Sequence, residues 1–294
     1  MSEQLPNSSS ADAVISVMGL SCHYKRTTAL DDVTLHIPKG SVFGLVGENG
    51  AGKTTLIRHV LGLQRPQKGT VSVFGLDPLA ESTSVLARVG YLSETRDLAP
   101  WMTVAEMIRF TGAFYPQWDF DYAEELRKQF DLDPTAKIST LSQGQLAKSG
   151  LLAALAHRPE LLVLDEPSSG LDPVVRRDIL EAIIRTVAEE GRTVLFSSHL
   201  LDEIERVSDF VGFLHAGKLA LTGTMDDVKA GYKVFTLAEE PPREEVLSAE
   251  RRGDVWEVVA RRSCDGSFGD NGAKPIRERA ASLEDIFVGL ASRK

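Results

Sequence analysis

The sequence predicts an α/β fold with a small α+β unit at its C-terminal end, and three features of the chain support this prediction. Short apolar segments typical of strands alternate with segments in which apolar residues recur every three or four positions, as in helices. A glycine-rich turn follows the apolar segment SVFGLV and leads into the helical segment TLIRHVLGL. The pattern changes near Thr224. We therefore expect a main domain over 14–224 and an accessory domain over 225–294.

The composition is that of an ordinary globular protein with an acidic balance. Of the 294 residues, 43% are hydrophobic and 26% are charged, and 33 Lys and Arg stand against 42 Asp and Glu, for a net charge of −9. This balance argues against a broad basic face, so no nucleic-acid partner is expected. No apolar run approaches the roughly 18 residues of a membrane-spanning helix. The two cysteines, Cys22 and Cys264, lie far apart and fit a reducing compartment, which indicates a cytoplasmic protein.

Strand-like and helix-like segments follow one another along the main domain. The polar start MSEQLPNSSSADA lacks the parts of a signal peptide, so 1–13 is predicted to be a disordered tail. Strands are predicted at VISV, TLHI, SVFGLV, TVSVFG, VGYLS, LLVLD and TVLFSSH, with a hairpin in DFVGFLHAGKLALTG that turns at Ala216-Gly217. Helices are predicted at TVAEMIRFTGAFY, DYAEELRKQFDL, RRDILEAIIRTVAEEG and LLDEIERVSD.

The accessory domain shows a mixed pattern of short elements. KVFTL and DVWEVVARR alternate as strands do, while REEVLSAE and SLEDIFVGLAS have the spacing of helices. The segment SCDGSFGDNG between them is rich in Gly and Asp and is predicted to be a loop.

The segment from Gly47 to Thr54 fits the pattern G-x-x-x-x-G-K-[ST] between a strand and a helix. Glycines let the backbone N–H groups curl inward toward phosphate oxygens at the positive end of the following helix. Lys53 supplies a charge for the β- and γ-phosphates, and the Thr54 hydroxyl is a ligand for Mg²⁺. The alternative, a glycine turn that happens to precede a lysine, does not explain this setting. The residues expected to contact a nucleotide here are Gly47, Asn49, Gly50, Ala51, Gly52, Lys53, Thr54 and Thr55.

Two adjacent carboxylates end the apolar strand LLVLD. Because neighbouring side chains of a strand point in opposite directions, Asp165 can hold Mg²⁺ while Glu166 faces the attacking water as a general base. An ordinary acidic exit from a strand explains Asp-Glu-Pro equally well. His199, at the end of TVLFSSH, could reach a phosphate or the same water, whereas the other five histidines are expected to be structural or solvated.

A further segment, LSQGQ, opens a helix about 20 residues before the strand that carries Asp165. It is similar to the signature LSGGQ, and with the phosphate loop and the acidic strand it makes 14–224 resemble the nucleotide-binding subunit of ABC transporters. The resemblance implies a P-loop, RecA-like core with an antiparallel β subdomain and an inserted α-helical subdomain at about 95–155. Its signature residues would be Ser142, Gln143, Gly144 and Gln145.

The resemblance also assigns roles to single residues. Tyr24 corresponds to the aromatic residue that stacks on adenine, although a plain strand-edge tyrosine is the alternative. Glu94 falls where the family has a glutamine that joins Mg²⁺ to the membrane partner, and this departure puts its role in doubt. Asp172 ends a loop that crosses between paired subunits, and His199 matches the histidine that contacts the γ-phosphate. Gln143 replaces the first signature glycine, with little expected loss.

The implied assembly is a head-to-tail dimer on the inner face of the cell membrane. Each ATP would lie between the Lys53 loop of one chain and the Ser142 segment of a second ATP-binding subunit, identical or closely related. Hydrolysis at Glu166 would reopen the pair and drive a separate integral membrane permease. The segment DLAPWMTV is predicted to form part of the contact with this permease, although Trp101 could equally serve packing.

The C-terminal segment SLEDIFVGL and the segment FYPQWD look like those of exporter-type bacterial subunits, FYPQWD resembling a subgroup linked to cell-envelope and antimicrobial-peptide stress. Two other functions fit the sequence less well. A soluble ATPase of this type acting on ribosomes or DNA usually carries two cassettes or a long coiled coil. A non-catalytic interaction protein would not need Lys53, Asp165, Glu166 and His199 together.

Overall fold

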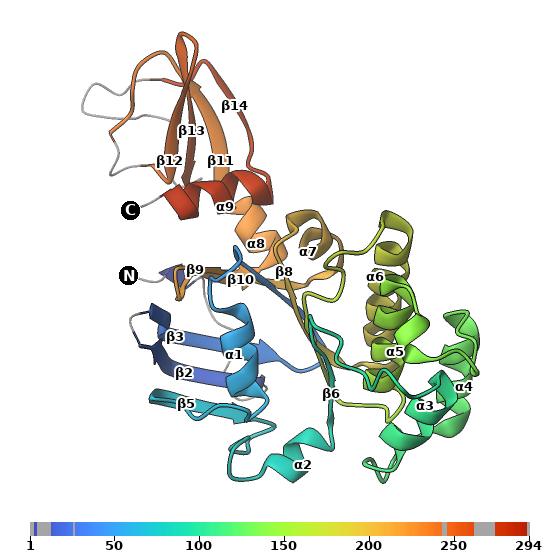
Figure 1. The fold of residues 1–294 in the computed structure, drawn as a ribbon. Helices are drawn as coiled ribbons and strands as arrows, with labels where there is room; N and C mark the ends of the chain where they lie inside the picture. The colour runs from blue at the N-terminus through green and yellow to red at the C-terminus, as the bar shows by residue number, and fades with distance from the viewer. Residues whose placement is uncertain (1–2, 5–12, 26, 243–245, 262–273, 293–294) are drawn as a thin grey trace.

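The structure is a computed structural model that describes residues 3–4, 13–25, 27–242, 246–261 and 274–292 (Figure 1). These residues form three β-sheets and the helices that cover them. No helix in the described ranges combines the length and the apolar character that crossing a bilayer requires.

A seven-stranded sheet is the centre of the main domain, in the order β1-β10-β9-β4-β8-β7-β6. β4, β6, β7, β8 and β9 run parallel to one another, and β10 returns antiparallel to β9. Ala216 and Gly217 both have positive φ at this return, so the predicted hairpin turn is confirmed. The strands are β1 (Glu3–Gln4), β4 (Val42–Val46), β6 (Val89–Leu92), β7 (Leu161–Asp165), β8 (Thr193–Ser198), β9 (Phe210–His215) and β10 (Lys218–Thr224).

Alternating side chains of these strands divide the core into two layers. Leu45, Val163 and Leu195 pack with an antiparallel three-stranded sheet and with helix α1 (Lys53–Val60). Leu164 and Phe196 face the helices on the other side, which are α5 (Gln143–Leu155), α6 (Pro173–Glu190) and α7 (Leu201–Val207). The three-stranded sheet has the order β3-β2-β5 and confirms the predicted antiparallel β subdomain. Its strands are β2 (Ala13–Tyr24), β3 (Thr27–Pro38) and β5 (Lys68–Val73).

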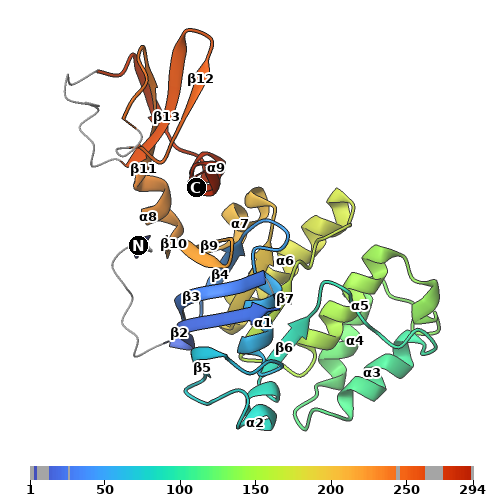
Figure 2. The same cartoon turned by 60° about the vertical axis from the view of Figure 1, so that its left-hand side comes forward.

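Helices α3, α4 and α5 gather at one end of the sheet in both views and form the predicted helical subdomain (Figures 1 and 2). Capping boxes begin two of them, with Thr103 before α3 and Ser142 before α5. The helices of the main domain are α1 (Lys53–Val60), α2 (Ser82–Leu86), α3 (Val104–Gly112), α4 (Phe120–Gln129), α5 (Gln143–Leu155), α6 (Pro173–Glu190) and α7 (Leu201–Val207), with a 3₁₀ turn at Ile138–Thr140.

After β10 the chain forms the third sheet, antiparallel throughout, in the order β12-β13-β11-β14. Helix α9 covers it and also contacts α7 and β9 of the main domain, where the rings of Phe287 and Phe213 lie 5.7 Å apart. Its elements are α8 (Met225–Ala230), β11 (Tyr232–Leu237), β12 (Ser248–Arg252), β13 (Val255–Arg261), β14 (Arg277–Ala280) and α9 (Leu283–Ser292).

Two predictions are wrong in part. The helix at REEVLSAE is replaced at its end by β12, because Ser248–Arg252 pair with β13 through a turn at Gly253, and this pairing outweighs local helix propensity. The tail at 1–13 is not wholly disordered, because Glu3–Gln4 pair with the otherwise open edge of β10 and Ala13 begins β2. The predicted loop SCDGSFGDNG, with Cys264, lies outside the described residues.

Candidate active site

The loop between β4 and α1 needs glycine at two positions for reasons of space. A Cβ atom on Gly47 would lie 2.4 Å from the carbonyl oxygen of Leu214, and one on Gly52 would lie 2.3 Å from that of Ala29. Gly52 also has a φ of 111°, which L-residues with a side chain rarely adopt. No side chain caps α1, so its first backbone N–H groups stay available to an anion.

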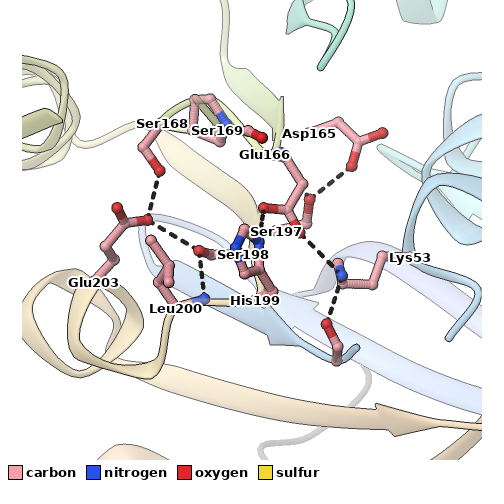
Figure 3. A network of polar contacts seen from close by, with 12 residues as sticks. Lys53, Asp165, Glu166, Ser168, Ser169, Ser197, Ser198, His199, Leu200 and Glu203 are labelled. Atoms are coloured by element: carbon pink, nitrogen blue, oxygen red, sulfur yellow. Dashed lines mark hydrogen bonds and ion pairs between the residues drawn. The ribbon is translucent and has the colours of Figure 1, made fainter. Parts of the chain in front are cut away.

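Lys53 lies between this loop and the end of β7 (Figure 3). Its side chain is only 6% exposed, and its Nζ donates to the carbonyl oxygens of Gly47 at 2.6 Å and Glu48 at 3.2 Å. Nζ also lies 3.0 Å from Glu166 Oε1, an ion pair that lacks the directional geometry of a hydrogen bond. The lysine thus connects the glycine loop with the second carboxylate of the acidic strand.

Asp165 and Glu166 point in different directions (Figure 3). Asp165 Oδ1 accepts a hydrogen bond from Ser197 Oγ at 2.7 Å, while Glu166 Oε2 lies 2.7 Å from His199 Nδ1. Glu166 has a left-handed φ of 49°, which costs about 1 kcal/mol for a residue with a side chain. Its N–H is held by the carbonyl and the hydroxyl oxygen of Ser197, at 3.2 and 3.0 Å. These bonds offset the strain and fix the carboxylate between Lys53 and His199.

Two further side chains at this edge, Glu203 and Tyr91, belong to no motif of the sequence. The carboxylate of Glu203, 1% exposed, accepts from Ser168 Oγ at 2.7 Å and from Ser198 Oγ at 2.9 Å, and its Oε1 lies 3.1 Å from Arg176 Nε. Burial and the negative charge of Asp165 raise the pKa of Tyr91 to about 12, so this phenol is neutral at physiological pH. For Glu203, the sequence indicates burial only through its place on the inward face of the helix LLDEIERVSD.

The remaining predicted residues lie around this centre. Tyr24 ends β2, is 44% exposed, and donates its hydroxyl hydrogen to Gln64 Oε1 at 2.5 Å. Asp172 Oδ1 caps α6 by accepting from Val174 N at 3.0 Å and Val175 N at 3.1 Å. Glu94 is exposed in the turn that follows β6.

The LSQGQ segment begins α5, on the opposite face of the central sheet from α1. Ser142 Oγ accepts from Gln145 N at 3.2 Å, and Gln145 Oε1 accepts from Ser142 N at 3.0 Å, so the predicted cap is confirmed. A Cβ on Gly144 would lie 2.9 Å from the side chain of Val175 on α6. This glycine therefore permits the close approach of α5 to α6.

Comparison with known proteins identifies the family of this fold and site. The ABC transporter family model matches residues 30–169. Bacitracin transport ATP-binding protein BcrA of Bacillus licheniformis is 30% identical over 94% of this chain and 97% of its own length. Nod factor export ATP-binding protein I of Neorhizobium galegae is 30% identical over 98% of this chain and 88% of its own length.

A solved structure of the ATP-binding subunit of an ABC transporter is also similar, with 31% identity and a TM-score of 0.68 over 74% of this chain and 92% of that one. The resemblance drawn from the sequence is thereby confirmed. The chain belongs to the family of ABC transporter ATP-binding proteins, which are ATP-hydrolysing enzymes.

Proposed function

We propose that this protein powers export through a separate integral membrane permease and that Lys53, Glu166 and His199 carry the hydrolysis. The observation that supports the hydrolytic part is the contact of Glu166 with both Lys53, at 3.0 Å, and His199, at 2.7 Å. The two relatives that align over most of this chain are named for bacitracin transport and Nod factor export. These names support an exporter subunit over an ATPase that acts on ribosomes or DNA. Both relatives align over nearly the whole chain, which supports a shared accessory domain at 225–294 beside the ATP-binding domain at 14–224.

In this proposal, Lys53 and the glycine-loop amides bind the β- and γ-phosphates, and Glu166 accepts the proton of the attacking water. His199 orients the Glu166 carboxylate through its hydrogen bond and reaches the γ-phosphate from its half-exposed position. Lys53 contacts both the phosphates and the Glu166 carboxylate, so nucleotide binding changes the charge that surrounds Glu166. Tyr24, exposed at the end of β2, stacks on adenine.

The site fits a Mg²⁺ ion that travels with the nucleotide. Asp165 is 1% exposed, and the structure gives its carboxylate no cation partner among the described residues, because Lys53 pairs with Glu166 instead. Buried carboxylates need a compensating cation, and hard oxygen ligands suit Mg²⁺. Asp165 and the Thr54 hydroxyl would hold the ion, with Glu94 as a further carboxylate. The ion would neutralise charge on the phosphate oxygens.

The proposed working unit is a head-to-tail pair of ATP-binding subunits. α5 and α1 lie on opposite faces of the central sheet, which supports a role for Ser142, Gln143, Gly144 and Gln145 on the nucleotide of a partner subunit rather than their own. Asp172, which caps α6, would lie in the loop between the subunits.

Replacement of Glu166 tests the hydrolytic proposal. Glu166→Gln keeps the shape but removes the base, so we expect turnover to fall about a hundredfold or more and an ATP-bound dimer to accumulate. Size-exclusion chromatography with ATP and Mg²⁺ measures the dimer. Glu160→Gln, at the opposite end of β7, is the matched control and should behave as wild type. A Glu166→Gln protein that stays monomeric with unchanged turnover would refute the proposal.

The exporter part needs a separate experiment. The protein is isolated by affinity from native membranes solubilised in mild detergent, and its partners are identified by mass spectrometry. Recovery of a polytopic membrane protein in stoichiometric amount is the expected result. Co-sedimentation with ribosomes in place of that partner would favour the alternative.

A further inference from the structure

Arg96 is a buried cation that none of the motifs above includes. It lies in the turn after β6, is 6% exposed, and has a left-handed φ of 50°. Its Nη2 donates to the carbonyl oxygens of Pro167 at 3.1 Å and Ser169 at 2.7 Å. Its Nη1 lies 3.4 Å from Gln143 Oε1, at the start of α5. One side chain therefore connects the turn after β6, the loop after Glu166 and the LSQGQ segment.

The guanidinium is held by backbone oxygens, and no ion pair with a carboxylate is found for it in the described parts of the chain. Burial lowers the pKa of Arg96, and the negative charge of Glu94 opposes this shift. An arginine stays charged even so, and a buried charge is costly unless its hydrogen bonds are made. The carbonyl oxygens of Pro167 and Ser169 accept from Nη2 and Gln143 Oε1 accepts from Nη1, whereas Nε has no hydrogen-bond partner among the described residues.

The bound carbonyls belong to the first half of the loop that joins Glu166 to Asp172. The loop starts at the strained backbone of Glu166 and ends where Asp172 caps α6. Two backbone hydrogen bonds form within the loop: Ser169 N donates to Glu166 O at 3.1 Å, and Leu171 N donates to Ser168 O at 3.2 Å. Arg96 adds the charged bonds that fix this loop against the rest of the subunit.

We propose that Arg96 is a positioning residue that holds 167–172 in the conformation required for ATP-driven pairing of two subunits. The inference rests on the proposed function, in which this loop crosses to the partner. Loss of the guanidinium would free two carbonyls and let the loop relax. The nucleotide pocket of the same subunit would be left intact, because the contacts of Lys53 with Gly47, Glu48 and Glu166 do not involve Arg96.

The test is made in the Glu166→Gln background, in which ATP-bound dimers accumulate. Arg96→Met keeps the aliphatic length but removes every donor, and Arg96→Lys keeps the charge but can reach only one carbonyl. Arg88→Met is the matched control, because Arg88 precedes β6 as Arg96 follows it and its bonds go to Glu160. Analytical ultracentrifugation with Mg·ATP gives the dimer dissociation constant, and a fluorescent ATP analogue gives the affinity of the monomer.

We expect Arg96→Met to raise the dimer dissociation constant about tenfold or more while the monomer's ATP affinity changes less than twofold. Arg96→Lys should restore part of the dimer affinity, and Arg88→Met should leave it unchanged. Equal dimer affinity with and without the guanidinium would overturn the inference, as would an equal loss of ATP affinity and dimerisation, which indicates general damage. If Arg96→Met does not fold, the Arg96→Lys protein decides by the same two measurements. A Glu166→Gln protein that binds ATP but never pairs would overturn the proposed dimer itself.

Discussion

A fall in pH is expected to weaken the junction between the helical subdomain and the central sheet through one histidine. His157 follows α5, is 2% exposed, and stacks on Tyr115 with ring centroids 3.9 Å apart. Its Nε2 lies 3.2 Å from the carbonyl oxygen of Val89 at the start of β6, which makes Nε2 the protonated nitrogen. Burial and, to a smaller extent, the positive charge of Arg192 lower the pKa of His157 to about 4, and the hydrogen bond with Val89 opposes this shift.

The size and direction of the effect follow from the difference between two pKa values. The unfolded chain binds the proton near pH 6.5, whereas folded His157 stays neutral to about pH 4. Its contribution to stability is therefore complete above pH 6.5 and is lost as the pH falls from 6.5 toward 4. At about 1.4 kcal/mol per pKa unit, the full loss is about 3 kcal/mol. Between pH 7 and pH 5 the same linkage gives about 2 kcal/mol.

Urea unfolding at pH 7 and pH 5 measures this loss. Trp118 stacks near His157, with centroids 6.4 Å apart, so its fluorescence reports locally once Trp101 and Trp256 are replaced by Phe. His157→Gln keeps an N–H donor for Val89 but cannot titrate in this range. The free energy of unfolding should fall about 2 kcal/mol more in the parent than in His157→Gln. An equal fall in the two proteins would show that His157 does not remain neutral in the folded state.

Two other contacts give predictions near the nucleotide site. Gln64→Leu removes the acceptor that orients Tyr24, so the KM for ATP should rise about two- to tenfold while inhibition by tripolyphosphate, which has no base, stays the same. A parallel loss of tripolyphosphate inhibition would contradict this role. Glu203→Gln removes the buried charge facing Arg176, and chemical denaturation should show a loss of about 2 kcal/mol. A fully stable Glu203→Gln protein would show that the ion pair of Glu203 with Arg176 adds no stability.

The chemistry of the site was largely readable from the sequence because each part of it is local. A glycine loop, a strand that ends in two carboxylates and a strand that ends in histidine can each be recognised from a few residues. The meeting of Lys53, Glu166 and His199 follows from topology, since β4, β7 and β8 are parallel neighbours whose carboxyl ends share one edge.

The supporting charges could not be predicted in the same way. Arg96 lies in a polar turn and Glu203 on an amphipathic helix, where charged residues are normally solvated. Both are buried here because segments distant in the sequence pack over them. The residues next to each charge in the sequence do not indicate such packing. The same limit explains β12, because Ser248–Glu250, the end of the predicted helix REEVLSAE, pair with β13 instead.

Arg96 and Glu203 both make hydrogen bonds to the segment 167–169, one to its backbone and the other to a side chain. The carbonyls of Pro167 and Ser169 face the guanidinium of Arg96, while the intervening hydroxyl of Ser168 faces the carboxylate of Glu203. The short loop after Glu166 is therefore held by a buried cation on its backbone and a buried anion on its side chain. Atoms of this loop make hydrogen bonds to both charges, beside the bond from Ser198 to Glu203 and the contact of Arg96 with Gln143, so a shift of the loop would leave each charge with fewer bonds. That joint cost favours one discrete position of the loop. A movement of the turn after β6 or of α7 would therefore also change the direction of the Glu166 carboxylate, which begins this loop.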